Sequence, residues 1–360
     1  MRKLATIREI GEIRPIPDAD RIEVAKVDGW EVVVAKKDNF KVGDLIVYIE
    51  IDSQMPEKPE YEFLKSRKYV VKTIKLRGQI SQGLILPLAV LPKGNYKLGD
   101  DVTEILGIVK YDPQLQEEEE IINYAKKNQK NPIIKYLLRY GWFRKIYLKP
   151  TNKTEFPTFI KKTDEERIQN CTRLFERMKE NRTPLSVTEK LDGCSATYFL
   201  KRHGKRKCEF GVCSRNRRLS TPDNTYYWKI ARQYNIENAL RKMLDKDDDY
   251  IVLQGEIIGE GIQGNKYKVK GFSFWAFNLI TSRKKYSTEE MKPILEKYGI
   301  QTVPILTSDY VVPDTIKDIV EYVKGKSKLL YREREGCVFR NIVNNISFKA
   351  INPDFLLAEG

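Results

Sequence analysis

Residues 187–195 constrain the fold most, because they place a lysine where a strand ends. They form the stretch Val-Thr-Glu-Lys-Leu-Asp-Gly-Cys-Ser, and a second apolar stretch, 196–200, follows directly. We interpret this as a strand, a tight turn and another strand, with Gly193 supplying a permissive backbone. Lys190 and Asp192 support two interpretations, a covalent lysine nucleophile or a hairpin with a surface salt bridge. On this stretch alone the hairpin is favoured, because a Lys-x-Asp-Gly match arises by chance in about one such chain in ten.

Composition and charge narrow the classes of function. The chain of 360 residues is long enough for two or three domains, and its net charge of +15 at pH 7 favours a polyanionic partner, by default nucleic acid. Basic residues cluster at 201–207, 215–218 and 266–270, at the density that phosphate contacts need. The alternative is a generally basic surface that only maintains solubility. The clustering in one half of the sequence favours the nucleic-acid partner.

Other classes are disfavoured by what the sequence lacks. No apolar run is long enough for a transmembrane helix, and the first residues lack the apolar segment of a signal peptide. Five cysteines without C-x-x-C spacing are typical of free thiols in a reducing cytoplasm. The only histidine, His203, lies in a basic run, which argues against Ser-His-Asp catalysis and multi-histidine metal sites. We therefore expect a cytoplasmic protein with no membrane partner.

Residues 1–108 are predicted to be all-β. Apolar and polar residues alternate through segments such as 4–13, 21–27 and 44–49, and Asp28-Gly29 is a strong hairpin signal. A small barrel of five or six strands, of the oligonucleotide-binding (OB) type, fits this pattern. An SH3-like barrel fits nearly as well.

Residues 109–182 are predicted to form a helical connector that leads into the next domain. Four glutamates at 117–120 open a charged stretch of helical character. Thr163 followed by Glu166 matches a capping box, which predicts a helix over 164–179.

Residues 183–360 are predicted to be α+β with an antiparallel sheet core. The elements lack the regular alternation of a Rossmann fold, and neither G-x-G-x-x-G nor G-x-x-x-x-G-K-[ST] occurs. The predicted strands are 187–189, 196–200, 208–214, 250–258, 272–279, 336–340 and 346–349. The predicted helices are 224–244, 288–298 and 316–324, the second of them with a capping box from Ser287 and Glu290.

Polar and aromatic residues on these strands add to the signal from Lys190. Glu256 lies inside a very apolar stretch, where a carboxylate is costly unless it is paired or binds a cation. Each residue alone has a structural explanation, as an ion pair, a core aromatic or a strand-end charge. The group consists of Arg215, Glu256, Phe277, Glu335 and Lys349, together with Lys190 and Asp192.

This group suits the attack of a lysine amine on the α-phosphorus of a nucleoside triphosphate. The amine must be neutral to attack, so burial or neighbouring positive charge has to lower the pKa of Lys190. Lys349, Arg215 and a divalent cation would do this and would stabilise the phosphoryl oxygens as pyrophosphate leaves.

The expected cation is Mg²⁺ or Mn²⁺, because both prefer oxygen ligands. The carboxylates of Asp192, Glu256 and Glu335 would hold the metal through waters and would also place the ribose hydroxyls. Phe277 would stack on the base.

Five motifs, in this order, resemble those of the covalent nucleotidyltransferases, which comprise ATP-dependent DNA ligases, RNA ligases and mRNA capping enzymes. Two positions depart from the pattern, since Asn278 stands where many members have Asp and Ile351 where many have a second lysine. The matching stretches are Lys-Leu-Asp-Gly at 190–193 (motif I), Ser-Arg-Asn at 214–216 (Ia), Trp-Ala-Phe-Asn at 275–278 (III), Glu-Gly-Cys-Val at 335–338 (IV) and Ser-Phe-Lys-Ala-Ile at 347–351 (V).

Further stretches resemble RNA ligases in particular. Residues 255–267 are similar to an element of RNA ligases of the phage T4 ligase 2 type. Residues 16–23 and 76–84 are similar to short sequence stretches in the barrel of the Deinococcus-type RNA ligases. The resemblance implies an N-terminal OB-like barrel, a helical connector and an antiparallel-sheet nucleotidyltransferase domain of the ligase/ATP-grasp-like kind.

The same resemblance implies an ATP-dependent RNA ligase with a role in RNA repair. Lys190 would take AMP from ATP, pass it to an RNA 5′-phosphate, and release it when a 3′-hydroxyl attacks. The implied catalytic residues are Lys190, Glu335 and Lys349. The implied nucleotide-binding residues are Glu189, Asp192, Gly193, Ser195, Arg215, Glu256, Phe277, Glu335 and Lys349.

An RNA ligase is favoured over a DNA ligase or a capping enzyme, because those enzymes carry a further C-terminal domain and only 11 residues follow Lys349. We expect a monomer that acts on a duplex nick or on RNA ends.

One alternative is a non-catalytic RNA-binding protein on a ligase fold. Its signature would be loss of Lys190, Glu335 or Lys349, and all three are present. Another is a repair scaffold that binds RNA tightly through its barrel without ATP.

Overall fold

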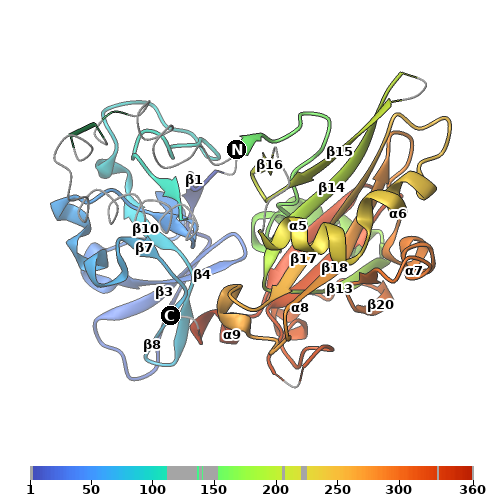
Figure 1. The fold of residues 1–360 in the computed structure, drawn as a ribbon. Coiled ribbons are helices and arrows are strands. Elements are labelled where there is room, and N and C mark those ends of the chain that lie inside the picture. The colour runs from blue at the N-terminus through green and yellow to red at the C-terminus, as the bar shows by residue number, and fades with distance from the viewer. Residues whose placement is uncertain are drawn as a thin grey trace.

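The protein has two lobes (Figure 1), an N-terminal one drawn in blue to cyan and a C-terminal one drawn in green to red. The computed structural model describes residues 3–111, 136–137, 140, 153–204, 207–219, 225–330 and 332–358. Most of the predicted helical connector, including the glutamates at 117–120, lies outside these residues. Among the helices that the model describes, none has the length and apolar character that a membrane span requires.

The N-terminal lobe is all-β, as its alternating sequence predicts. In β4 (Trp30–Ala35), for example, every second side chain is buried, and its partner β3 (Ile22–Val27) is joined to it by the turn at Asp28, whose φ is 51°. The hairpin prediction for Asp28-Gly29 is therefore confirmed. The other strands are β1 (Ala5–Glu9), β2 (Glu12–Pro15), β5 (Leu45–Ile49), β6 (Ser53–Gln54), β7 (Val70–Val71), β8 (Ile74–Leu76), β9 (Gln79–Ser81), β10 (Leu84–Pro87) and β11 (Val109–Lys110).

Two sheets form the C-terminal lobe, and both are largely antiparallel, as predicted. The larger has the order β12-β16-β15-β14-β17-β18-β19, and the smaller has the order β20-β13-β21-β22. The strands of the larger sheet are β12 (Lys153–Glu155), β14 (Cys194–His203), β15 (Lys207–Cys213), β16 (Arg217–Leu219), β17 (Tyr250–Gly259), β18 (Phe272–Thr281) and β19 (Gln301–Thr302). Those of the smaller sheet are β13 (Leu185–Lys190), β20 (Ile305–Tyr310), β21 (Gly336–Asn341) and β22 (Ile346–Ile351).

Helices cover the outer faces of these sheets. In Figure 1, α5 (Tyr226–Gln233) and α6 (Ile236–Met243) lie across the larger sheet, where their apolar faces join its core. The prediction of one helix over 224–244 is wrong, because Asn235 adopts a left-handed conformation (φ 46°) and divides it. The remaining helices are α4 (Thr172–Glu180), α7 (Thr288–Glu296), α8 (Ile316–Tyr322) and α9 (Pro353–Leu357).

The two predicted capping boxes differ in outcome. At α7 the box is confirmed, since Glu290 N–H donates to Ser287 Oγ (3.1 Å) and Ser287 N–H donates to a Glu290 carboxylate oxygen (2.8 Å). The helix predicted to begin at residue 164 is wrong, because α4 begins only at Thr172. Residues 163–167 instead run beside β22, where Lys349 N–H donates to the Glu166 carbonyl (2.8 Å). The tertiary pairing thus outweighs the local helix signal.

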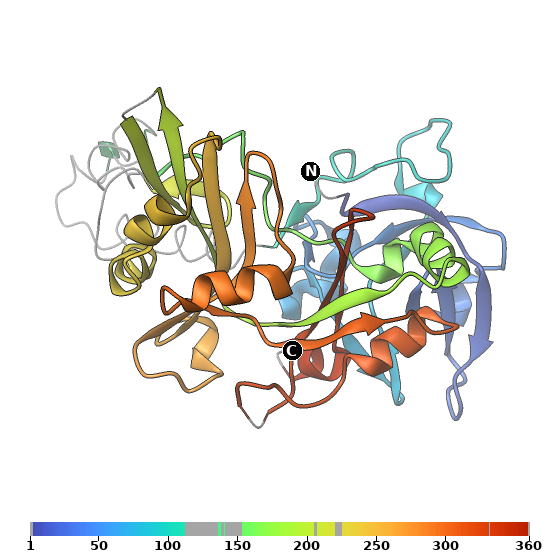
Figure 2. The ribbon, with the colours of Figure 1, turned by 90° about the vertical axis from the view of Figure 1, so that its right-hand side faces the viewer.

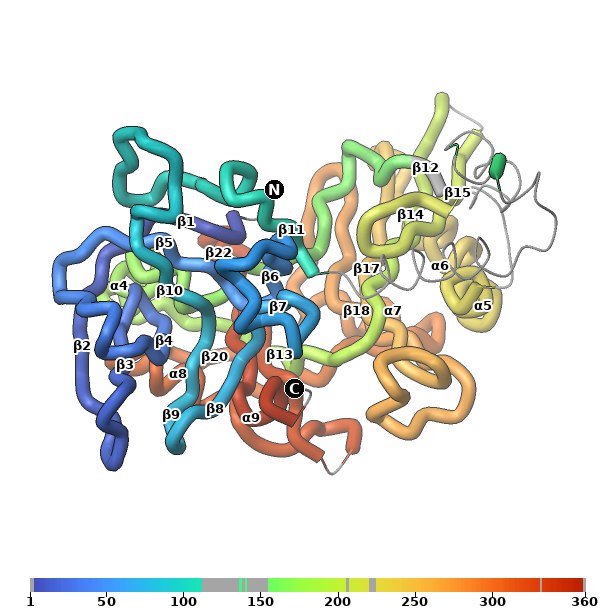
Figure 3. Tube along the Cα trace, turned by 90° about the vertical axis from the view of Figure 1, so that its left-hand side faces the viewer, coloured from blue at the N-terminus to red at the C-terminus, as the bar shows by residue number. Residues whose placement is uncertain are grey.

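The segment before α4 also holds the two lobes together. Trp30 Nε1–H donates to Asn170 Oδ1 (2.6 Å), and Arg167 Nη2 lies 2.9 Å from Asp52 Oδ2. The side chain of Arg167 is only 5% exposed. Figures 2 and 3 show the smaller sheet beside the N-terminal lobe from two further sides. The barrel therefore rests against the sheet that carries β13, β21 and β22.

Candidate active site

Lys190 lies at the junction of the two C-terminal sheets. It is the last residue of β13 and pairs in register with Gly336, the first residue of β21, while β14 begins at Cys194 in the other sheet. The turn at 191–193 therefore crosses between sheets, and the alternative of a simple hairpin is wrong. Lys190 Nζ lies 2.6 Å and 2.7 Å from the two carboxylate oxygens of Glu335.

Gly193 is required in this turn for close packing. A Cβ atom on Gly193 would lie 2.3 Å from the Ile257 carbonyl oxygen, on the neighbouring strand β17. Gly193 does not have a positive φ, so the predicted reason for a glycine, a permissive backbone, is wrong. The glycine is needed because a side chain would not fit. Lys190 is thus held by a turn pressed against the larger sheet.

Two residues after β17, Lys266 and Tyr267, hold this turn in place, and neither was predicted as a site residue. Tyr267 Oη accepts a hydrogen bond from Asp192 N–H (2.9 Å), and Lys266 Nζ lies 2.5 Å from Asp192 Oδ2. Both residues belong to the stretch 255–267 that resembles RNA ligases. That resemblance was the signal that could have identified them.

The electrostatics keep Lys190 protonated in this state. Burial lowers the pKa of its amine, but the carboxylates of Glu335, Glu256 and Asp192 more than compensate, so the pKa lies above its usual value. The amine becomes a nucleophile only when positive charge enters the site or these carboxylates are engaged elsewhere.

Glu256 is the carboxylate of this group whose negative charge is least balanced by nearby cations. Burial, opposed by Lys190 and reinforced by Glu335 and Asp192, raises its pKa to about 8. Among the described residues its side chain has no hydrogen bond or ion pair, whereas Asp192 and Glu335 each pair with a lysine. No three His, Cys, Asp or Glu side chains within the described part of the chain are close enough to ligate one metal directly. Direct coordination by all three predicted metal ligands is therefore absent from this arrangement.

A second cluster of charges gathers around Asp164, with cations from β22, from the loop between β15 and β16, and from β11 of the N-terminal lobe. Asp164 Oδ1 lies 3.3 Å from Lys349 Nζ and 3.1 Å from Arg215 Nη2, and Asp164 Oδ2 lies 3.0 Å from Lys110 Nζ. Burial opposes ionisation of Asp164, but the three cations hold its pKa far below the usual value. The predicted residues Arg215 and Lys349 are thus brought together. Neither Asp164 nor Lys110 was predicted as a site residue, because both lie outside the motifs.

The aromatic wall of the site is formed on β18. Gln254 pairs with Asn278 and Gly255 with Ala276, so Phe277 is the extra residue of a β-bulge. It packs in a small apolar cluster with Leu191. Asn278 is turned away, since its amide donates to Gln254 Oε1 (2.9 Å).

The last two predicted nucleotide ligands lie on either side of the turn. Glu189 is buried and accepts a hydrogen bond from Lys328 N–H (2.8 Å), while its Oε1 has no hydrogen-bond partner in the described structure. Ser195 Oγ lies 2.9 Å from Thr163 Oγ1. Thr163 is therefore tied to the site and not to a helix cap.

Comparisons with known proteins agree with this architecture. An OB-fold domain model matches residues 4–88, which decides between the two barrel types, and an RNA ligase model matches residues 183–351. The chain is similar to a solved structure of Naegleria gruberi RNA ligase with pyrophosphate, with 35% sequence identity, a TM-score of 0.78, and coverage of 99% of this chain and 98% of that one. A lysine-to-methionine variant of that ligase, solved with AMP and Mn, matches with the same values. A search of curated protein sequences gave no significant match. The chain therefore belongs to the RNA ligase family, as an RNA ligase with an N-terminal OB-fold domain.

Proposed function

We propose that this RNA ligase uses ATP and works through a lysyl-AMP intermediate on Lys190. The observation that carries the proposal is the position of the Lys190 amine, at the end of β13 and within 2.7 Å of both Glu335 oxygens. The amine therefore lies among carboxylates, and the two cations that would receive phosphates, Arg215 and Lys349, are held together by Asp164.

In the first step the neutral amine of Lys190 attacks the α-phosphorus of ATP. A nitrogen–phosphorus bond forms, the bond to the leaving pyrophosphate breaks, and the amine loses its proton to water. Lys349 and Arg215 are the groups on this chain that would balance the negative charge of the phosphates. Their present counter-ion, Asp164, is displaced or shared when the phosphates enter.

In the second step an RNA 5′-phosphate oxygen attacks the phosphorus of lysyl-AMP, and the Lys190 amine leaves. In the third step a 3′-hydroxyl attacks the adenylylated 5′ end, a phosphodiester forms, and AMP leaves. The reaction thus joins a 3′-hydroxyl RNA end to a 5′-phosphate, and Lys190 is regenerated for another cycle. We place this activity in RNA repair.

Mg²⁺ or Mn²⁺ is the cofactor that the donor set fits, since all the available ligands are carboxylate oxygens. Asp192, Glu256 and Glu335 would hold the ion through waters, because they do not converge closely enough to ligate it directly. The half-buried carboxylate of Glu256, which has no partner among the described residues, supports this assignment. When bound, the ion supplies positive charge that lowers the pKa of the lysine and stabilises phosphoryl oxygens.

The remaining contacts of the nucleotide are assigned by position. Phe277 would stack on the adenine, and Glu256 would also accept a hydrogen bond from a ribose hydroxyl. Asp192, Gly193 and Ser195 would line the nucleotide along the turn, and the buried Oε1 of Glu189 is an acceptor without a partner in the described structure.

We also infer a monomer in the cytoplasm that acts on nicked duplexes or RNA ends. The two lobes contact each other within one chain, and all five cysteines are free thiols, as a reducing compartment would keep them. Light scattering of the purified protein would test the monomer, and localisation of the tagged protein would test the compartment.

The test of the chemistry is labelling with ATP carrying ³²P on the α-phosphate, in Mg²⁺ or Mn²⁺, followed by a denaturing gel. We expect an acid-labile label on the wild type and on Lys270→Ala, a matched surface change, and none on Lys190→Ala. No label on the wild type with either metal would contradict the proposal and favour a non-catalytic RNA-binding protein on a ligase fold.

A further inference from the structure

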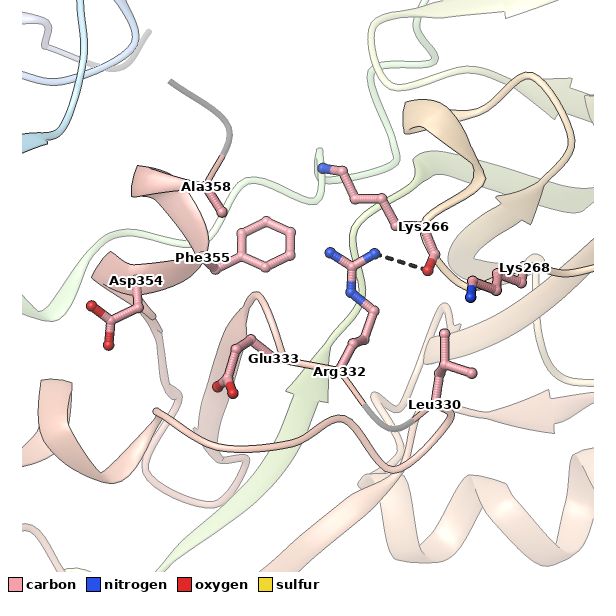
Figure 4. Close-up of a pocket in the computed structure, with 8 residues that line it drawn as sticks. All are labelled: Lys266, Lys268, Leu330, Arg332, Glu333, Asp354, Phe355 and Ala358. Atoms are coloured by element: carbon pink, nitrogen blue, oxygen red, sulfur yellow. Dashed lines mark hydrogen bonds between the residues drawn. The ribbon is translucent and has the colours of Figure 1, made fainter.

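A cationic cavity of about 340 Å³ lies beside the Lys190 turn. Figure 4 shows its lining, which comes from three separate parts of the chain. Lys266 and Lys268 follow β17, Arg332 precedes β21, and Phe355 belongs to α9. Lys266 connects this cavity to the site described above, because its amine also contacts Asp192, two residues from Lys190.

Arg332 is held in place by a backbone carbonyl and an aromatic ring. Its Nη1 donates to the Lys266 carbonyl (2.8 Å), and its guanidinium carbon lies 5.7 Å from the centre of the Phe355 ring. No carboxylate among the described residues pairs with Arg332 or with the exposed Lys268. Since Phe355 is only 4% exposed, it supports the arginine and is not a stacking surface.

The acids that line the cavity are already neutralised from outside it. Glu333 pairs with Lys326 (2.6 Å), and Asp354 lies 3.7 Å from Lys324. In Figure 4 the Asp354 carboxylate points away from Arg332. The cavity therefore keeps a net positive charge and offers guanidinium N–H donors, which is the chemistry that recognises a phosphate.

We propose that this cavity binds a backbone phosphate of the RNA substrate, near the end that is adenylylated. The proposal rests on the proposed ligase function and adds to it a contact outside the nucleotide site. Arg332 and Lys268 come from different segments, so together they fix where the strand lies relative to Lys190 without reading its sequence. Asp192 already engages Lys266 on the side of the nucleotide site, which leaves Arg332 and Lys268 as the principal phosphate ligands.

The test compares Arg332→Ala and Lys268→Gln with Arg332→Lys and Lys297→Gln. Lys297 is an exposed lysine at the end of α7, outside the basic clusters and outside the cavity lining, and melting curves verify that each variant folds. Two quantities are measured. One is the affinity for a nicked RNA duplex with a 5′-phosphate, without ATP, over a range of salt concentrations. The other is the KM for ATP in lysine adenylylation without RNA.

We expect Arg332→Ala to weaken RNA binding by about tenfold, the loss of one charge-assisted phosphate contact. The slope of log affinity against log salt should fall by about 0.9 for each cation removed. Arg332→Lys should recover part of the loss, Lys297→Gln should behave as wild type, and the KM for ATP should stay within twofold.

Two results would overturn the proposal. One is unchanged RNA affinity in folded Arg332→Ala and Lys268→Gln, and the other is a raised KM for ATP with RNA affinity intact, which would assign the cavity to the nucleotide. A wild type that takes no label from ATP would refute the lysyl-AMP mechanism. The RNA-binding measurement would still decide the role of the cavity in that case.

Discussion

Asp164 Oδ1 lies 3.3 Å from Lys349 Nζ, although 185 residues separate the two in the sequence. The same carboxylate contacts Arg215 and Lys110. Asp164 is thus the common counter-ion of three cations, Lys110 from the N-terminal lobe and Arg215 and Lys349 from the C-terminal lobe. Without it, these like charges would face one another at a partly desolvated site.

Asp164→Asn should destabilise the protein by about 1–2 kcal/mol at pH 7, a value reduced for solvent screening because the side chain is 34% exposed. The folded-state pKa of Asp164 is depressed, so its contribution is present above the unfolded pKa near 3.8 and is lost as pH falls below it. Urea unfolding between pH 3 and 7 should show the difference from wild type shrinking below pH 4. Asp314→Asn, at a 91% exposed surface pair with Lys179, should change stability little at any pH. An Asp164→Asn defect that is constant with pH would contradict the role of charge.

Glu335→Gln should shift the pH profile of lysine adenylylation to lower pH. Among the groups that raise the pKa of Lys190, Glu335 acts most strongly, so its neutral isostere lets the amine lose its proton more readily. The maximal rate should nevertheless fall, by about 100-fold, because a group of the charged site is lost. Single-turnover labelling between pH 6 and 9 measures both quantities. Glu321→Gln, which removes an exposed ion pair with Lys324, is the matched control, and its pH profile should match the wild type. An unshifted profile in Glu335→Gln would contradict the influence of Glu335 on the pKa of Lys190.

Much of the site could be predicted because its residues lie on strands with strong local patterns. Lys190, Glu335 and Lys349 follow from the motif order, and the fold brings them together since β13, β21 and β22 are neighbours in one sheet. The prediction for α7 succeeded because both partners of its capping box lie within four residues. In these cases the local signal and the tertiary structure agree.

The sequence failed where a residue is positioned by partners far along the chain. Thr163 and Glu166 match a helix cap, but Ser195 and the backbone of Lys349 offer them tertiary partners that the local pattern cannot reveal. Asp164 was overlooked for the same reason, because an acid at a helix start has an ordinary explanation. Gly193 was identified correctly but for the wrong cause, since close approach to another strand leaves no local trace.

Binding of Mn²⁺ should strengthen by about tenfold per pH unit up to about pH 8 and then level off. The pKa of Glu256 is raised to about 8, so below that pH the cation must displace one proton from the carboxyl group. Titration calorimetry at pH 6, 7, 8 and 9 would measure the affinity and the protons released. Glu256→Gln should bind more weakly and lose this pH dependence. An affinity of the wild type that is flat from pH 6 to 8 would remove Glu256 from the metal site.

Gly193→Ala should slow adenylylation at least about tenfold, because even a small displacement of the turn misplaces the Lys190 amine. The new methyl group would approach the Ile257 carbonyl oxygen to 2.3 Å, and that oxygen is backbone of β17 that cannot rotate away. The overpacking should also destabilise the fold by about 1–3 kcal/mol. Gly204→Ala separates the two effects: its Cβ would meet nothing within 4 Å, but its φ of 69° imposes backbone strain of about 1 kcal/mol far from Lys190. We therefore expect Gly204→Ala to lower the melting temperature without slowing the labelling of Lys190, and Gly193→Ala to do both. Equal labelling rates in the two variants, measured well below their melting temperatures, would mean that the turn tolerates displacement and that the amine is positioned by Glu335 alone.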